Sequence, residues 1–355
     1  MKPPVGAAEA AKLLAGGPKG PKPLTSRRSG SRDSRRSYIG AIALALATTT
    51  AHAQLWVPEK GAGAIGLSYQ YAVDHTHLDG NGDEFGPGNM ASNSLQLRVD
   101  YGLTDRLALQ VTAPWINKRY VGAGPHDPSP FDPPDHEGAM AGPADHPGDV
   151  GEDVAILDDG DWHGAWQDMG VGLRLRWIEP GPGQPWTVTP FAHYSWPSHD
   201  YTFFAHAAIG SRQKRLAIGT MAGRQFGPRF QNLYFQGLYS YTFVEEILDV
   251  RTNYSSLNLD VGYHFTPRFN ARVQVMLRKT HGGLDIPFDF PSRTSELFFH
   301  HDQIQRVDYV NWGVGANWKL GERYSLSANW YTTLWGENGH KVHNGVGIGI
   351  TRTFD

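Results

Sequence analysis

Four histidines lie in a strongly acidic part of the sequence: His126, His136, His146 and His163. The stretch from Tyr120 to Leu173 contains 12 Asp and Glu residues and no Lys or Arg. Imidazole and carboxylate groups bind divalent metals such as Zn²⁺ and Cu²⁺, so these histidines are candidate metal ligands. Their spacing matches no defined metal motif. The alternative is a solvated loop whose charge concentrates cations.

A second set of charged residues recurs at alternate positions in extended segments. It comprises Arg98, Asp100, Arg174, Arg176, Asp260, Arg272, Arg278 and Lys319. Because alternate residues of a strand share one face, we expect these side chains on the polar face of their strands. There they could steer an anionic substrate along a pore. A network of Arg–carboxylate pairs that fills the interior explains the same pattern equally well.

The elements that position these residues are strands, because period-two alternation dominates the chain after Gln54. Leu95, Leu97 and Val99, for example, alternate with Gln96 and Arg98. The polar faces are rich in Gly, which suits a tight interior, and aromatic residues collect beside the turns, as in the girdles of membrane barrels. The pattern therefore predicts an all-β protein, a transmembrane antiparallel up-and-down β-barrel with apolar side chains facing lipid and polar ones facing the lumen.

Turn lengths support the same fold. We expect strands near residues 62–73, 92–102, 106–118, 167–178, 185–197, 212–225, 230–243, 254–265, 268–279, 307–319, 323–335 and 341–354. Tight turns rich in Gly, Pro and Asp alternate with longer links, which is the plan of outer-membrane barrels. This predicts about twelve strands, with ten or fourteen as alternatives, and a long acidic extracellular loop over residues 120–166.

Residues 1–53 form a basic leader with a signal peptide. Arg35 and Arg36 precede the apolar segment from Tyr38 to Ala47, and small residues allow cleavage after Ala53. The twin-arginine route is the alternative, but it carries folded cargo, whereas a barrel must cross the inner membrane unfolded. We therefore expect Sec-type export of residues 54–355 to the bacterial outer membrane.

Composition narrows the function. The 355 residues are 40% hydrophobic and 19% charged, with a net charge of -3 and no Cys. The apolar fraction is too high for a disordered chain, and the part after Ala53 has no basic footprint for nucleic acid. No cofactor and no energy-coupling or nucleotide motif is predicted. The expected partners are outer-membrane lipids, a small-molecule substrate and the barrel-assembly machinery.

The segment from Tyr101 to Leu109, YGLTDRLAL, followed by the Pro114–Trp115 pair, resembles the family of outer-membrane transporters called the MetA-pathway of phenol degradation family. In that family a similar hairpin precedes a strand that ends in a Pro–aromatic pair. A later GLGD strand is matched imperfectly by the residues from Gln167 to Gly172. The resemblance covers most of the chain after the leader and implies an outer-membrane barrel that passes hydrophobic or aromatic compounds.

Two further segments leave alternatives open. The link after residue 279 contains Leu284, Ile286, Phe288, Phe290 and Leu297 to Phe299 beside His300 and His301. This apolar link either folds inward as a plug or extends the strands. His193 and Ser195 share one strand face and could form a hydrolytic pair, as in outer-membrane phospholipase A. That pair faces lipid, whereas Tyr194 and Trp196 take the lipid face here, so we do not expect an enzyme.

The predicted function is therefore passive uptake of small molecules through an outer-membrane channel, with hydrophobic or aromatic substrates implied by the resemblance. A barrel that does not conduct and instead binds ions or partners at its surface is the main alternative. A lipid hydrolase is the third.

Overall fold

The computed structural model describes residues 57–85, 88–122, 157–285 and 295–355. The predictions that concern the leader, the cleavage site and most of the acidic loop lie outside these residues. So do three of the apolar residues of the later link, Ile286, Phe288 and Phe290.

Extended strands dominate the described residues, as their alternating sequences predict. They are β1 (Gly63–Leu78), β2 (Glu84–Phe85), β3 (Gly88–Gly102), β4 (Leu107–Gly122), β5 (His163–Trp166), β6 (Met169–Leu175), β7 (Trp186–Trp196), β8 (Arg215–Gln225), β9 (Leu233–Val244), β10 (Tyr254–Thr266), β11 (Phe269–Thr280), β12 (Asp308–Lys319), β13 (Tyr324–Glu337) and β14 (Gly339–Phe354). The helical elements are the 3-10 turn η1 (Pro228–Phe230), α4 (Glu296–Phe299) and α5 (His301–Ile304). No helix in the described part of the chain is long and apolar enough to cross a bilayer.

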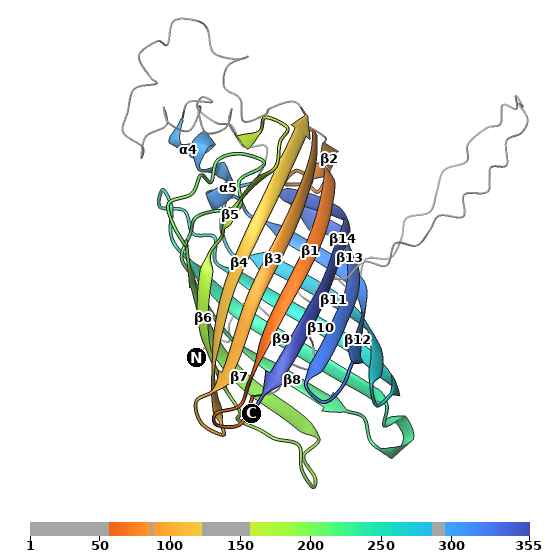
Figure 1. Ribbon diagram of the computed structural model, residues 1–355. Helices are drawn as coiled ribbons and strands as arrows, with labels where there is room; N and C mark the ends of the chain where they lie inside the picture. Colours follow the sequence, from red (N-terminus) through yellow and green to blue (C-terminus); the bar gives the residue numbers. More distant parts are fainter. Residues whose placement is uncertain (1–56, 86–87, 123–156, 286–294) are drawn as a thin grey trace, which may run out of the picture. The chain divides into compact units, whose positions relative to one another are not determined.

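Twelve of these strands form a closed antiparallel barrel, in which each strand pairs with the next along the chain. The barrel closes between its first and last members, because β1 pairs with β14 from Gly63 opposite Phe354 to Leu78 opposite Gly339. The two short strands, β2 and β5, pair with β1 and β4 outside this path. Closure leaves no unpaired edge, which is the condition for spanning a membrane with strands (Figure 1).

The predicted fold class and strand number are thus confirmed, and each predicted strand range overlaps one barrel strand. The acidic loop is shorter than expected at both ends. Strand β4 continues to Gly122, and His163–Trp166 forms β5 against the residues from Trp115 to Lys118 of β4. Backbone pairing extends here beyond the residues with apolar alternation, because a neighbouring strand supplies hydrogen bonds whatever the side chains are.

The two faces of the strands differ as expected for a barrel with apolar side chains toward lipid and polar side chains toward the lumen. In β11, Val273 is 50% exposed, whereas its neighbours Arg272 and Gln274 are 3% and 4% exposed. In β12, Val314 is exposed, and the polar face of the same strand contains the buried Asn311. Apolar side chains therefore cover the outside and polar side chains fill the inside, the reverse of a soluble sheet sandwich.

Threonine side chains organise two of the short turns. Thr104 Oγ1 accepts hydrogen bonds from the backbone N–H groups of Arg106 and Leu107 at 3.2 and 3.0 Å. In the β10–β11 turn, Thr266 Oγ1 accepts from Arg268 N and Phe269 N at 3.2 and 3.0 Å. Each hydroxyl satisfies donors that the ladder leaves unpaired, so the Thr-x-Arg sequence sets a tight turn.

The lengths of the connections distinguish the two ends of the barrel. The turn end has the short connections at residues 103–106, 176–185, 226–232, 267–268 and 320–323, and it also holds the C-terminus (Figure 1). The loop end has the longer connections, the one-residue link at Asn338 between β13 and β14, and the helices α4 and α5. Aromatic side chains at the turn end are strongly exposed, with values of 67% for Trp177, 60% for Phe265 and 56% for Trp318. Their place next to the turns fits an interfacial girdle.

Candidate functional site

A buried cluster of charges lies inside the barrel near the turn end. Arg98 Nε donates to Asp100 Oδ2 at 2.8 Å, and Arg174 Nη2 donates to Asp100 Oδ1 at 2.6 Å. The side chains of Asp100 and Arg174 are 7% and 1% exposed. Alternation of β3 and β6 turns all three side chains to the inside. Asp100 pairs with Gln110 of β4 and Arg174 with Ala108, two residues away on the same strand, so the register brings them close across β4. Two guanidinium groups thus share one carboxylate, so the cluster keeps one net positive charge.

A second pair lies on the β10–β11 hairpin. Arg272 Nε is 3.7 Å from Asp260 Oδ1, and the Arg272 side chain is fully buried. Residues Gly262 and Gly315 lie opposite Arg272 on its two neighbouring strands. A Cβ atom at Gly315 would lie 2.9 Å from the Arg272 guanidinium carbon, so the missing side chain makes room for the arginine.

The other three predicted lumen residues lie apart from these groups. Arg176 donates to the carbonyl oxygen of Val57 and is 3.0 Å from Glu179. Arg278 lines a cavity at the loop end, and Lys319 is exposed at the last position of β12. The structure therefore joins Arg98, Asp100 and Arg174 in one cluster and Asp260 with Arg272 in a pair, and it separates Arg176, Arg278 and Lys319 from both. Passage of a solute along any of them stays a prediction.

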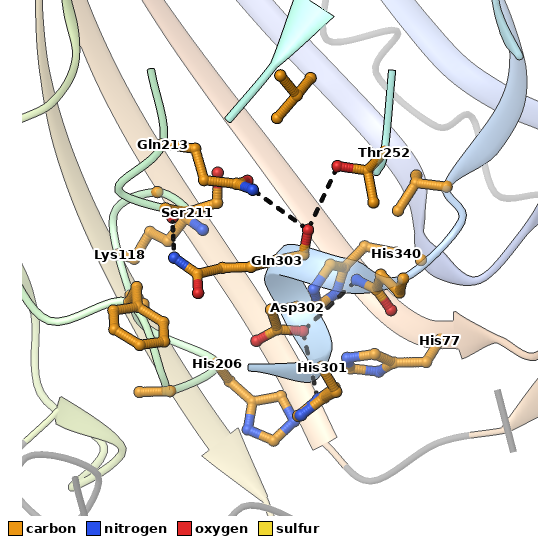
Figure 2. Close-up of a pocket in the computed structure, with 18 of the residues that line it drawn as sticks. His77, Lys118, His206, Ser211, Gln213, Thr252, His301, Asp302, Gln303 and His340 are labelled. Atoms are coloured by element: carbon orange, nitrogen blue, oxygen red, sulfur yellow. Dashed lines mark hydrogen bonds and ion pairs between the residues drawn. The ribbon is translucent and has the colours of Figure 1, made fainter. Parts of the chain in front are cut away.

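A cavity of about 520 Å³ lies at the loop end, and we call it the vestibule. Its walls include His77 of β1, Lys118 of β4, Arg278 of β11 and His340 of β14, together with residues of α4 and α5. Strands from all around the barrel thus border it. Figure 2 shows α5 in the middle of these side chains, with His77 and His340 on one side and Lys118 on the other.

The helix α5 is held in this position mainly by Gln303. The Gln303 side chain donates to the carbonyl oxygen of Ser211 at 2.6 Å. Its main-chain carbonyl accepts from Gln213 Nε2 at 3.3 Å and from Thr252 Oγ1 at 3.4 Å (Figure 2). The neighbouring Ile304 has no exposed surface. Of the two alternatives for this link, the structure therefore supports inward folding in its described part.

Apolar packing completes the attachment of the helices. Phe298 and Phe299 of α4 pack with Phe203 and Phe204 from the connection between β7 and β8. The ring centroids of Phe204 and Phe299 are 5.2 Å apart in an edge-to-face arrangement. The apolar residues of the link are thus used to fix a cap at the loop end, and aromatic pairs of this geometry add to the stability that burial provides.

A second cavity, of about 650 Å³, lies at the turn end. The residues that line it include Val57, Arg176, Arg224, Tyr234 and His264. Val57 is 1% exposed and Pro58 is also fully buried, so these two residues pack against the inside of this end, whereas Glu59 and Lys60 are exposed. The interior of the barrel therefore has a cavity near each end, and the buried Arg–Asp cluster lies in the half that contains the second one.

The candidate metal ligands are not brought together among the described residues. His163 Nε2 is 2.8 Å from Asp159 Oδ1, and this hydrogen bond is the main cause that lowers the pKa of Asp159. His126, His136 and His146 lie outside the described residues. Within the described ranges, no three His, Cys, Asp or Glu residues have a geometry that could hold a metal ion.

The possible hydrolytic pair faces the inside of the barrel, as its strand position predicts. Tyr194 and Trp196 are 40% and 37% exposed, whereas His193 and Ser195, which alternate with them, are partly buried. His193 Nε2 is 3.5 Å from Thr112 Oγ1, and its ring covers Gly170 and Gly172 of β6. The His193 side chain thus fills the space that two glycines leave, which is a packing role.

Sequence reasoning missed three residues that shape the vestibule: Lys118, Gln303 and His340. Lys118 continues the inward positions of β4, so strict alternation from Ala108 onward would have identified it. Gln303 had no signal in the sequence, because its role depends on where a loop helix folds back.

Comparisons with known proteins agree on the fold. The sequence matches no protein-family profile and no curated protein. The structure is similar to an outer-membrane channel from Pseudomonas putida F1, with a TM-score of 0.60 and 15% identity over 84% of this chain and 97% of that chain. Two similar structures with lower scores are the NanC porin and the β domain of a Bordetella autotransporter. Their TM-scores are 0.42 and 0.45, and their identities 11% and 10%. They cover 82% and 83% of this chain and all of the other chain.

At 15% identity the similarity to the Pseudomonas putida F1 structure establishes the fold alone, an outer-membrane type of β-barrel, and the two lower-scoring structures carry no argument.

Proposed function

We propose that this protein is a passive channel of the bacterial outer membrane for small molecules, and that hydrophobic or aromatic compounds are among its substrates. The observation that carries the proposal is the interior of the barrel. Polar and charged side chains face inward, and cavities of about 520 and 650 Å³ lie toward its two ends. A barrel that served only as a scaffold would gain stability from a filled core, whereas a polar interior with cavities suits solutes. The similar channel from Pseudomonas putida F1 adds support.

The cavities also suit molecules with apolar parts. The vestibule is lined by Phe203, Phe298 and Leu78 in addition to its charged residues. Binding sites for small molecules combine such apolar walls with a few polar groups. Transport is driven by the concentration gradient in this proposal. Export through a signal peptide cleaved after Ala53 belongs to it as well.

A barrel without conduction is the second candidate, and one observation favours it. The Gln303 contacts hold α5 inside the loop end, and the Arg98–Asp100–Arg174 cluster occupies the inside near the turn end. Together these elements narrow the path between the two cavities. A barrel whose path is blocked in this way would not conduct and would instead bind ions or partners at its surface.

Reconstitution distinguishes the two candidates. The protein is extracted from the outer-membrane fraction, where its N-terminal sequence is expected to begin at Gln54, and is inserted into planar bilayers and liposomes. We expect discrete single-channel steps, and faster liposome swelling with benzoate and phenol than with sugars of similar mass.

The variant Gln303→Ala is expected to raise the open probability, because α5 loses its side-chain bond to Ser211. Gln305→Ala is the matched control, because Gln305 directly follows α5 and its side chain contacts only Asp302 of that helix among the hydrogen-bond partners of the described residues. If neither the native protein nor Gln303→Ala conducts ions or swells liposomes, the channel proposal is wrong and the closed barrel is supported.

A further inference from the structure

The vestibule contains two cations that face each other across the barrel. Lys118 belongs to β4 and Arg278 to β11, and both line the cavity. Six strand pairings separate β4 from β11 in either direction around the closed barrel. The two side chains therefore come from opposite walls and point into the same space. Figure 2 shows the Lys118 side of this space, next to Ser211.

Neither cation forms a direct ion pair with a carboxylate in the described part of the chain, although Asp74, Asp302 and Asp158 attract the Lys118 ammonium and Asp308 attracts the Arg278 guanidinium from farther away. Arg278 lies over the ring of Tyr254, with 3.9 Å between the guanidinium carbon and the ring centroid, and its Nε is buried without a hydrogen-bond partner. Lys118 has no ion pair or hydrogen bond with the described residues. The two arginines near the turn end differ, because Arg98 and Arg174 both pair with Asp100. Partly buried charges without a direct partner cost free energy, and an anion bound between the two side chains would complete them.

The charge of the vestibule lining as a whole is also positive. Besides Lys118 and Arg278 it includes Arg215, which is 3.4 Å from Asp168, and a single acidic residue, Asp302. His301 Nε2 is 3.3 Å from Asp302 Oδ1, so that carboxylate already has a neighbour. With neutral histidines the lining has an excess of positive charge, which favours an anion.

The remaining wall is apolar. Phe203 and Phe298 belong to the cluster that fixes α4, and Leu78 and Val244 line the cavity from β1 and β9. A volume of about 520 Å³ accommodates a molecule of the size of one substituted aromatic ring together with water. An anion with an apolar body would thus contact both the cations and the aromatic side chains.

We propose that the vestibule is a binding site for small organic carboxylates. In this site Lys118 and Arg278 hold the carboxylate from opposite walls, and the side chains of Phe203 and Phe298 contact the apolar part. This inference rests on the proposed channel function and names the substrate class at its loop end. The carboxylate accepts charge-assisted hydrogen bonds from the Lys118 ammonium and from the Arg278 guanidinium.

The test measures binding without conduction. The probe is 4-fluorobenzoate, added to the full-length protein in detergent, and its binding is followed by ¹⁹F line broadening and by calorimetry. We expect saturable binding of 4-fluorobenzoate and at least about tenfold weaker binding of 4-fluorobenzyl alcohol, which lacks the charge. Acetate is expected to compete weakly, because it lacks the apolar body.

Each of the variants Lys118→Gln and Arg278→Gln is expected to weaken binding of 4-fluorobenzoate by about tenfold, because one charged contact is lost. Lys118→Arg should restore most of the affinity, which a purely structural role would not predict. Lys319→Gln is the matched control, because Lys319 is exposed at the other end of the barrel. Heat-modifiable gel mobility verifies that each variant is folded.

Equal affinity of the acid and the alcohol, or unchanged affinity in both variants, would overturn the inference. Absence of saturable binding to the folded native protein would do the same. The outcome is separable from that of the channel proposal. Binding without conductance leaves the site intact and removes the channel, whereas conductance without binding leaves the channel and removes the site.

Discussion

Asp100 provides the negative charge that pairs with two arginines inside the turn end. Its two carboxylate oxygens accept from Arg98 and Arg174, and the Arg174 side chain is 1% exposed. A buried ion pair contributes little net stability compared with apolar packing, but loss of one partner leaves the other charge uncompensated. With two arginines on one carboxylate, removal of the acid exposes two like charges to each other.

We therefore expect Asp100→Asn to destabilise the folded barrel by about 3 kcal/mol. The same change adds one positive charge to the interior, so the reversal potential of a salt gradient should shift toward anion selectivity. Urea unfolding in lipid vesicles, followed by Trp fluorescence, measures the first effect, and planar bilayers measure the second. The control is Asp249→Asn, in an exposed turn at the loop end. Equal unfolding midpoints for the two variants would refute the role of Asp100.

At the scale of elements, glycines on one strand accommodate large inward side chains on the next. Gly262 of β10 lies opposite Tyr234 of β9, and a Cβ atom there would be 2.2 Å from the Tyr234 ring. Gly345 of β14 has the same relation to Tyr331 of β13. The Gly-rich polar faces in the sequence thus have a packing cause, because a closed barrel has less room inside than outside.

We expect Gly262→Ala to destabilise the barrel by about 1 to 3 kcal/mol, because the added methyl group overlaps the Tyr234 ring. The substitution Gly321→Ala is the control, since no atom lies within 4 Å of a Cβ at that position. Adding Tyr234→Ala to Gly262→Ala should remove the steric part of the loss, and a double-mutant cycle in urea measures it. A cycle with no coupling energy would show that the two residues do not compete for space.

At the scale of the whole molecule, the barrel has its apolar side chains outside and ion pairs inside, the reverse of a water-soluble protein. The exposed apolar residues lie on every face of the barrel, as Ile218 of β8, Val261 of β10 and Ile348 of β14 illustrate. In water such a surface would aggregate, whereas in a bilayer it contacts acyl chains. The environment, rather than an internal apolar core, therefore selects this arrangement.

Consequently, Val273→Arg is expected to destabilise the protein by about 2 to 4 kcal/mol in phospholipid vesicles, because Val273 is 50% exposed in the middle of β11. Leu248→Arg is the control, because Leu248 is equally apolar and is exposed in a turn at the loop end. Equilibrium unfolding in urea compares the two. A small and equal effect of both variants would mean that the outer face of β11 does not contact lipid.

The strands and their faces could be predicted from the sequence because both depend on local periodicity. Alternation at Val273 and its neighbours is sufficient to assign an inside and an outside, and Thr104 and Thr266 mark turns by hydrogen bonds within a few residues. The inward position of Lys118 could also be predicted in this way, because Lys118 continues the alternation of β4. The gathering of Arg98, Asp100 and Arg174 is not, because it needs the register of three strands.

The sequence by itself determined the barrel class, a strand number of about twelve, and the face of most side chains in the regular parts of the strands, since a pleated strand alternates whatever surrounds it. Only the tertiary structure decided which inward residues meet. The positions of Lys118 and Arg278 on opposite walls depend on closure of the barrel, and the position of Gln303 depends on a loop that folds back inside. These contacts join residues that are distant in the chain, and local periodicity carries no information about such distances.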